Sequence, residues 1–408
     1  MNQPIQLTFG TYGHTLHHCQ IMSPDNQWIV YDTRNEDSQI GTTTCIERVN
    51  VQTKAIEVLY ETTNHNSYGP GVGAATYSPM KERVIFIHGI NFPTKENPYG
   101  MARRTAVAID VNHPNMPIHM DARNTIYPFT KGALRGGTHS HCWHPAGELV
   151  SFTYNDEVLS NHERVVGVMF PKKVDVEDEN SPNNFSGEMF SVVITQLVDR
   201  AKNGSDEIEK AFDECWLGEK KELVFQGWIR DDNGDRKTEI FKATLPDDLT
   251  VVDSVPLEGT EIAFPGIPKG VIIERVTRTP KGVSDFRHWL RSSPDGENVY
   301  FLMEDEYLCT NIFELSIKSG HIRQVTFHEN SIHSPINIST DGTKFTYLCN
   351  QSLIVLNHFD TYNPIVLDES QWLYGIPNFD KNGQFIYYNK YVEDRSASKH
   401  LQIFKIEL

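Results

Sequence analysis

The sequence predicts an all-β chain folded as a seven-bladed β-propeller, and three observations lead to that fold class. A phrase of the Ser-Pro-Asp-Gly type recurs along the 408 residues, each time between a short apolar lead and an alternating strand. A second pair of strands follows most copies, which gives repeats of four strands that can bury their faces only by stacking on neighbours. The final residues form a further strand with no later partner. The whole chain, 1–408, is therefore expected to be one ring and one domain.

Each copy of the phrase predicts a tight hairpin, because proline fixes φ and the Asp-Gly pair supplies the turn. The copies lie at residues 21–26, 77–80, 143–147, 292–296, 338–342 and 379–383. The second strand pairs are clearest at residues 44–49, 105–111, 311–326 and 353–356. Residues 222–230 and 238–243 supply a degenerate seventh copy in the long interval that remains. Seven repeats predict seven blades.

Two segments of the chain differ from the repeat. Residues 155–218 interrupt the pattern with an acidic stretch at 174–184 and a stretch at 206–216 whose apolar residues have helical spacing. We expect an insertion beside the third blade, partly loop and partly one short helix. At the end of the chain, residues 400–408 alternate like a strand and are expected to pair with the first strand, around residues 6–9, which closes the ring and removes an exposed edge.

The composition restricts the function classes. With 37 basic and 54 acidic residues the formal net charge is −17, which argues against a broad nucleic-acid surface. No apolar run approaches the ~20 residues needed to cross a bilayer, so no membrane role is expected. The start of the sequence has neither a basic nor an apolar signal region, and the six cysteines are scattered. We therefore expect a cytoplasmic protein with reduced thiols. The oligomeric state cannot be read from the sequence.

Histidine, arginine and tyrosine gather most densely in the stretch from Arg135 to Tyr154. The pair Gly136-Gly137 is expected to let the chain turn sharply before an extended segment. In such a segment His139 and His141 share a face, and imidazole suits proton transfer near neutrality. Titratable groups recur just before the hairpins, where a propeller has its innermost strands: His14, His17, His18, Tyr68, Tyr77, His139, His141, Asp285, Arg287, His288, His333 and Tyr374. A wet central channel would also accommodate such residues without any catalytic role.

Five phrases of this sequence carry a family resemblance: 86–89 (FIHG), 135–141 (RGGTHSH), 152–156 (FTYND), 164–168 (RVVGV) and 225–228 (FQGW). They resemble an uncharacterised family of bacterial TolB-like propeller proteins, which is similar to the propeller polysaccharide lyases, the ulvan lyases most closely and oligogalacturonate lyase more remotely. The resemblance implies β-elimination at a uronic acid, with His and Tyr in proton transfer and Arg at the substrate carboxylate. By position it implies these catalytic residues: His88, His139, His141, Tyr154 and Arg164.

Such a reaction needs the carboxylate charge neutralised, which Arg164, Arg135 or a metal ion can do. A base must then remove the C5 proton, and an acid must protonate the leaving oxygen. Tyr154 is the first candidate for the base, although tyrosine titrates near ~10 and needs a neighbouring cation to lower its pKa. Further substrate contacts are expected from Arg135, Tyr68, Arg287 and Trp228. Because the sequence shows no secretory signal, a short acidic oligosaccharide is favoured over a polymer as the substrate.

A divalent metal site is also predicted, from His288, His333 and Cys349 on adjacent blades. Histidine and cysteine suit zinc, and a metal in the propeller is what the lyase resemblance implies, so zinc, manganese and calcium are all open. A propeller can have two functions other than that of a lyase. A non-catalytic TolB-like scaffold that binds a protein or peptide is the alternative to a lyase. A propeller hydrolase is disfavoured, because the sequence has no Gly-x-Ser-x-Gly motif.

Overall fold

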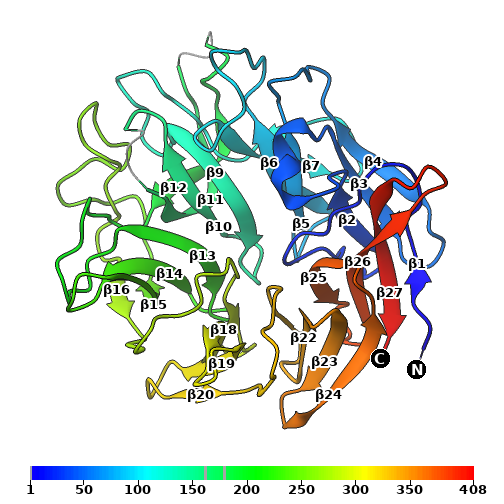
Figure 1. Cartoon of the computed structure of the whole chain (residues 1–408). Helices are drawn as coiled ribbons and strands as arrows, with labels where there is room; N and C mark the ends of the chain where they lie inside the picture. The colour runs from blue at the N-terminus through cyan, green and yellow to red at the C-terminus, as the bar shows by residue number, and fades with distance from the viewer. Residues whose placement is uncertain (1, 160–162, 178–180) are drawn as a thin grey trace.

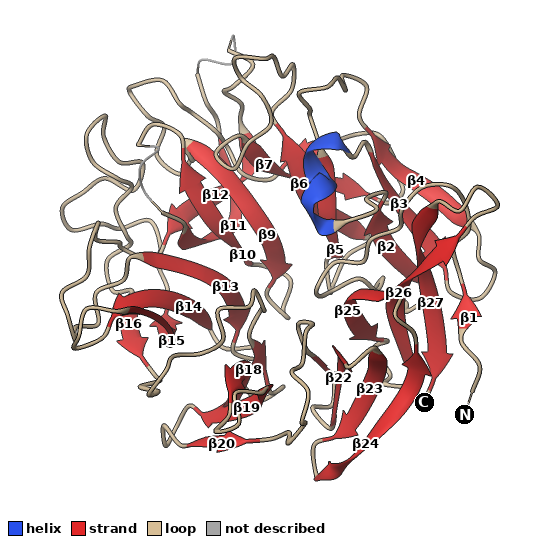
Figure 2. Cartoon of the chain, in the orientation of Figure 1, coloured by secondary structure: helices blue, strands red, loops and turns tan. Residues whose placement is uncertain are grey.

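The computed structural model describes residues 2–159, 163–177 and 181–408, and these form seven antiparallel sheets arranged in a ring (Figures 1 and 2). The predicted seven-bladed β-propeller is therefore confirmed. The first three blades contain, from the inner strand outward, β2 (Trp28–Asp32), β3 (Cys45–Asn50) and β4 (Ile56–Glu61); β5 (Val72–Tyr77), β6 (Arg83–Gly89), β7 (Arg104–Asp110) and β8 (Ile118–His119); and β9 (Gly136–Trp143), β10 (Val150–Asp156), β11 (Val165–Val174) and β12 (Gly187–Val193).

The fourth to seventh blades contain β13 (Lys210–Trp216), β14 (Glu222–Arg230), β15 (Arg236–Thr244) and β16 (Ile272–Arg275); β17 (Arg291–Ser292), β18 (Asn298–Glu304), β19 (Thr310–Ser316) and β20 (Ile322–Gln324); β21 (Asn337–Ile338), β22 (Lys344–Cys349), β23 (Ser352–Asn357) and β24 (Asp360–Glu369); and β25 (Leu373–Phe379), β26 (Phe385–Glu393), β27 (Lys399–Glu407) and β1 (Ile5–Gln6). A 3₁₀ helix, η1 (Asp37–Thr42), follows β2. Among the described residues, no helix has the length and apolar character to cross a membrane.

The turn formed by the Ser-Pro-Asp-Gly phrase is held by a set of hydrogen bonds. Ser293 Oγ donates to Asp295 Oδ1 at 2.5 Å and accepts the backbone N–H of Asn298 at 3.0 Å. Gly296 takes the positive φ of 68° that the turn requires. The copy that starts at Ser339 repeats these contacts. The phrase therefore joins each innermost strand to the next strand of its blade.

The ring closes through the chain ends, as the sequence predicted. In the last blade β1 lies beside β27, with Ile5 opposite Lys405, and Leu7 N donates to Ile403 O at 2.8 Å. Figure 1 shows both termini at this blade. The first blade keeps an inner edge of two isolated bridges, Thr15 with Asp32 and Met22 with Ile29. Apolar clusters pack adjacent blades together, for example Val168 of β11 against Phe225 of β14.

The predicted helix within 155–218 is wrong. Residues 210–216 form β13, the innermost strand of the fourth blade, while β11 and β12 complete the third blade. The ladder between β13 and β14 shifts register between Phe212 and Cys215, and Asp213 has a φ of 52°. This bulge breaks the two-residue alternation, so the buried residues imitate helical spacing. The acidic stretch at 174–184 lies between β11 and β12, and its residues 178–180 are outside the described part of the chain.

Candidate functional site

A cavity of about 250 Å³ lies at one end of the central channel, where four arginines converge. It is lined by His17, Arg34, Asp37, Ser38, Ile40, Ala74, Ile87, Met101, Arg104, His139, Ser140, Arg164, Arg287 and Trp289. These residues come from the segment before β2, from η1, from β5, β6, β7 and β9, and from the chain just before β11 and β17. The cavity therefore collects side chains from four of the seven blades.

Bulges on the inner strands shape this cavity. Ala74 of β5 has a φ of 57° and Ser140 of β9 has a φ of 52°, and both residues line the cavity. Because such a residue interrupts the alternation of a strand, His139 and His141 do not face the same way. His139 lines the cavity, whereas buried His141 bonds Thr138 Oγ1 at 2.9 Å through Nε2. The expectation that the two histidines share one face is wrong for this reason.

The Gly136-Gly137 pair has a different role from the expected sharp turn. Neither glycine is among the residues with positive φ, and both lie inside β9. A Cβ on Gly137 would lie 2.1 Å from Met101 O, and a Cβ on Gly136 would lie 2.1 Å from Asn155 O. Only a residue without a side chain allows these backbones to approach so closely, and that approach brings Met101 to the cavity wall.

The cavity carries an excess of positive charge. Arg34 is neutralised by Asp32 at 2.6 Å and by Asp37 at 2.9 Å. Within the described residues, Arg104 and Arg164 have no carboxylate within 4.0 Å, although their guanidinium groups are only partly exposed. Burial lowers the pKa of Arg164 to about 10, and repulsion from Arg287 and Arg104 adds to the shift. An anion bound here would remove this repulsion.

Arg287 completes the cationic wall from the segment before β17. Its side chain is 49% exposed, and its closest carboxylates are Asp37 and Asp213, both at 3.7 Å. The guanidinium lies over the ring of Trp289, 4.4 Å from its centroid. Such a contact leaves the N–H groups of the guanidinium edge free to bind a planar anion. The placement agrees with the predicted contact between Arg287 and substrate.

His139 is oriented by two hydrogen bonds. Arg104 Nη1 donates to His139 Nδ1 at 3.0 Å, so the ring proton is on Nε2, which donates to Asn155 Oδ1 at 3.0 Å. Arg164 Nε reaches the same Asn155 oxygen at 3.3 Å. Burial, followed by the charges of Arg164 and Arg104, holds the pKa of His139 well below its usual value. The site therefore contains a neutral imidazole whose unprotonated nitrogen faces an arginine.

His88 does not line this cavity. Its Nε2 lies 2.9 Å from the hydroxyl of Tyr60 on β4, and its Nδ1 bonds the carbonyl of Gly89. Burial lowers its pKa to about 4. The Nε2 contact joins the second blade to the first, and Nδ1 is used within the second blade, so both nitrogens have a structural role.

Tyr154 and Arg135 also lie outside the cavity, in one buried network. The Tyr154 hydroxyl donates to Asp156 Oδ2 at 2.9 Å, and Arg135 Nε contacts the same oxygen at 2.8 Å. Burial and the Asp156 carboxylate raise the pKa of Tyr154 well above its usual value, and the opposing charges of Arg135 and Arg123 do not offset this shift. Arg135 bonds the carbonyls of Thr260 and Ala263, which ties the loop between β15 and β16 to the third blade.

Two predicted substrate contacts, Tyr68 and Trp228, are not among the residues that line the cavity. Tyr68 is 39% exposed in the loop before β5, where its carbonyl accepts the N–H of Tyr99. Trp228 lies on β14, with Lys210 and Arg236 stacked over its ring at 4.2 and 3.9 Å.

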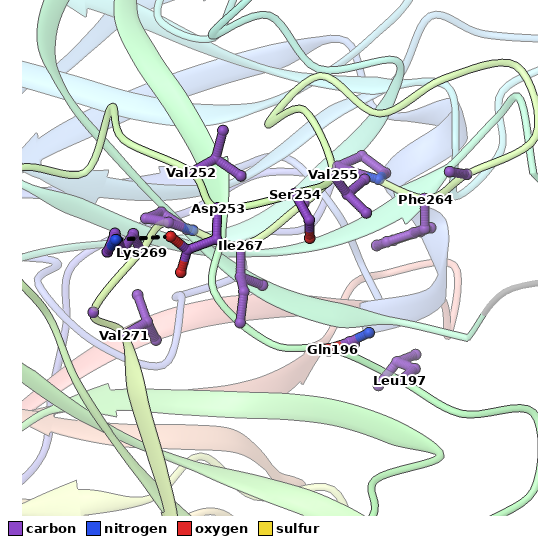
Figure 3. A pocket seen from close by; sticks show the side chains of 15 residues that line it. Gln196, Leu197, Val252, Asp253, Ser254, Val255, Phe264, Ile267, Lys269 and Val271 are labelled. Carbon is purple, nitrogen blue, oxygen red and sulfur yellow. Dashed lines mark ion pairs between the residues drawn. The ribbon is translucent and has the colours of Figure 1, made fainter.

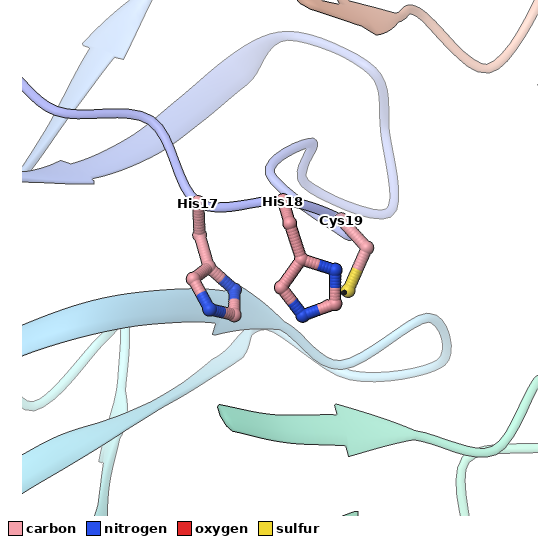
Figure 4. Close-up of side chains that lie close together, drawn as sticks. All are labelled: His17, His18 and Cys19. Atoms are coloured by element: carbon pink, nitrogen blue, oxygen red, sulfur yellow. Dashed lines mark hydrogen bonds between the residues drawn. The ribbon is translucent and has the colours of Figure 1, made fainter. Parts of the chain in front are cut away.

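The predicted metal ligands do not come together. His288 uses both ring nitrogens on the backbone, with Nδ1 bonding Phe286 O at 2.7 Å and Nε2 accepting Leu302 N–H at 3.1 Å. Cys349 donates to Asn330 O at 3.2 Å, and His333 is exposed. Among the residues that the structure describes, His17, His18 and Cys19 form a group whose ligand atoms lie within 4.8 Å of one another (Figure 4).

Several lining residues were not among the predicted site residues. Arg104, Arg34, Asp37 and Trp289 carry no motif that marks them, and their convergence depends on which blades are adjacent. His17 was noted as an inner-strand position but not assigned to the site. The signal that could have found Arg104 is its place at the start of β7, directly after a loop.

A second, larger cavity of about 460 Å³ lies between the loop that joins β15 to β16 and residues 196–197 (Figure 3). Its lining includes one ion pair, Asp253 with Lys269 at 2.9 Å, and is otherwise mostly aliphatic. It contains no histidine, cysteine or arginine, so the cationic cavity is the stronger candidate for chemistry.

Comparison with known proteins gives a family and a fold. Residues 71–185 match a family model described as "Protein of unknown function (DUF3748)". The uncharacterized protein YidR of Escherichia coli (strain K12) is 34% identical over 351 residues, which is 83% of this chain and 82% of YidR. This relationship covers most of the length of both chains.

Solved structures with low sequence identity share the architecture. An oligogalacturonate lyase in complex with manganese has a TM-score of 0.57 at 11% identity, with 100% of this chain and 98% of that chain covered. A puromycin hydrolase has a TM-score of 0.57 at 10% identity, covering 98% of this chain and 52% of that one. TolB from Acinetobacter baumannii reaches a TM-score of 0.42 at 11% identity, covering 93% and 80%. The lyase and the puromycin hydrolase show the fold, which hosts different functions, and neither of them is an ulvan lyase.

Proposed function

Because the chain belongs to the DUF3748 family, whose function is unknown, its activity must be inferred from the site, and we propose that it is a carbon–oxygen lyase that cleaves a uronate-containing oligosaccharide by β-elimination. The observation that carries this proposal is the set of three arginines, Arg104, Arg164 and Arg287, around the neutral imidazole of His139. The oligogalacturonate lyase of the same fold acts, by its name, on an acidic sugar.

Substrate binding follows from the charges. A uronate carboxylate offers two oxygens to planar guanidinium groups, and Arg164 and Arg287 present such groups to the cavity. The negative charge relieves the mutual repulsion of the arginines. As the C5 proton leaves, further negative charge spreads from C5 onto the carboxylate oxygens, where the same cations stabilise it.

Proton transfer falls to His139. A carboxylate that competes for Arg104 frees His139 Nδ1, which now accepts from Arg104 Nη1 at 3.0 Å. The C5 proton moves to this nitrogen, its electron pair forms the C4–C5 double bond, and the C4–O bond breaks. The imidazolium then protonates the leaving oxygen, provided that both lie on one face of the sugar. Asn155 holds the ring in position through Nε2–H, and the bound carboxylate raises the basicity that the arginines lower in the free protein.

The test is incubation of the full-length protein with uronate oligosaccharides, oligogalacturonates first, while following the ultraviolet absorbance of the 4,5-unsaturated product. We expect His139→Gln and Arg164→Gln to abolish the signal, and the control Arg278→Gln, an exposed arginine paired with Asp206, to keep it. No absorbance with any acidic glycan would contradict the lyase proposal. Binding without product would favour the non-catalytic scaffold.

A further inference from the structure

Three of the six cysteines meet at the other end of the central channel. Cys19 lies before β2, Cys142 near the end of β9, and Cys215 near the end of β13, and all three line one cavity of about 450 Å³. His139 and Ser140, earlier on β9, line the cationic cavity, whereas Cys142 and Trp143 line this one. The two cavities therefore follow one another along the same inner strand. We name the cavity lined by Cys19, Cys142 and Cys215 the thiol cavity.

The side chains of His18, Cys19 and Cys142 are close enough to share one ion. The two sulfur atoms of Cys19 and Cys142 are 3.4 Å apart, and His18 Nε2 lies 3.4 Å from Cys142 Sγ and 3.7 Å from Cys19 Sγ. Figure 4 shows the side chains of His18 and Cys19 projecting from one loop toward the same point. All three cysteines are free thiols.

These separations match the edges of a tetrahedral zinc site. With bonds of about 2.3 Å to sulfur and about 2.0 Å to nitrogen, tetrahedral ligands lie about 3.8 Å apart for two sulfurs and about 3.5 Å for sulfur and nitrogen. The three measured edges differ from these values by 0.1 to 0.4 Å, which small side-chain rotations can correct. A fourth ligand is available from Cys215, from His17, whose ring nitrogen lies within 4.8 Å of the His18 and Cys19 ligand atoms, or from water in the cavity.

The surroundings hold His18 in place. Its ring stacks on Trp289, with centroids 4.0 Å apart and an angle of 5° between the planes. Arg291 Nη2 donates to the His18 carbonyl at 2.8 Å and lies 3.4 Å from Nδ1. The guanidinium is thus bound mainly to the carbonyl, and Nε2 of the ring is left facing the two sulfurs. A fixed imidazole next to two sulfurs loses little conformational freedom when it binds an ion.

The donor set selects the kind of ion. Manganese, which the structurally similar oligogalacturonate lyase contains, is bound best by oxygen and imidazole ligands. Two thiolates and one imidazole instead favour zinc. We propose that His18, Cys19 and Cys142 form a structural zinc site that links the first blade to the third across the channel.

Cobalt is the direct probe, because it replaces zinc in tetrahedral sites and reports sulfur ligands by light absorption. We expect the full-length, chelator-treated protein to bind about one cobalt per chain, with an intense thiolate-to-cobalt charge-transfer band that one equivalent of zinc removes. Cys142→Ser should lose that band, and Cys309→Ser, a partly exposed cysteine in the fifth blade, should keep it. The wild-type spectrum needs no variant, so a misfolded Cys142→Ser protein does not spoil the test.

Three results would overturn the proposal. The first is cobalt binding without a charge-transfer band, which means oxygen or nitrogen ligands only. The second is a band that survives Cys142→Ser in folded protein. The third is four rather than six free thiols in the denatured, unreduced protein with no bound zinc, which means that Cys19 and Cys142 form a disulfide. None of these measurements depends on lyase activity, so the proposed function and the zinc site fail independently.

Discussion

Replacing Arg164 with glutamine should stabilise the protein while weakening anion binding. The guanidinium is mostly enclosed beside Arg104 and Arg287, and its pKa falls from 12.5 to about 10. At about 1.4 kcal/mol for each pKa unit, the charged group costs the folded state about 3 kcal/mol. The side chain still touches solvent in the cavity, and it donates to Asn155 Oδ1 at 3.3 Å, so we expect a net gain of about 1 to 2 kcal/mol.

The assay is urea unfolding of both proteins at pH 7.5 and low salt, repeated with an acidic oligosaccharide present. The ligand should raise the midpoint of the wild type, because binding to the folded state stabilises it, and should raise that of Arg164→Gln far less. Loss of a charge-assisted pair predicts roughly 10- to 100-fold weaker binding. The matched control is Arg278→Gln, whose exposed side chain should change stability by less than about 0.5 kcal/mol. A destabilisation of Arg164→Gln by more than about 1 kcal/mol would refute the reasoning, since the arginine would then be structural.

Three further outcomes follow from the structure. Stability should fall steeply as the pH drops from about 6.5 toward 4, because buried His88 and His288 both have pKa values of about 4 in the folded protein, whereas the histidines of the unfolded chain bind protons at higher pH. Thermal denaturation across this pH range measures the loss, and a melting temperature that does not change with pH would contradict it. Tyr154→Phe should cost about 1 to 3 kcal/mol in unfolding free energy, because it removes a hydrogen bond to a buried carboxylate, but should leave turnover within about twofold; a large loss of turnover in folded protein would restore a catalytic role. Deleting residues 2–7 should lower the melting temperature by exposing the edge of β27, and an unchanged melting temperature would show that β1 does not close the ring.

The recurring hairpin phrase made the blade count predictable. The hydrogen bonds that form its turn are local, as those among Ser293, Asp295 and Asn298 are, so each copy can be recognised without knowledge of the rest of the fold. Ring closure was also predictable, because a strand of alternating residues at the end of the chain needs a partner. The same local reasoning failed at 206–216, where a bulge at Asp213 shifts the alternation that identifies a strand.

The site was predicted only in part, because the local spacing of residues does not show which side chains converge from different blades. His139, Arg164 and Arg287 do line the cationic cavity. His88 and Tyr154 stand in motifs as distinctive as that of His139, yet their side chains point into packing between blades or within one. Arg104 lies 35 residues from His139 in sequence and 3.0 Å from it in the fold.

The sequence by itself determined the repeat, the number of blades and the closure of the ring, because these depend on turn chemistry and strand alternation within about forty residues. Only the tertiary structure decided which polar groups share a space. Cys19 and Cys142 are separated by 123 residues, and their sulfurs come within 3.4 Å because the inner edges of the first and third blades both border the central channel. A ring places distant segments at one centre, and the direction of each side chain there depends on bulges that no periodic pattern reveals.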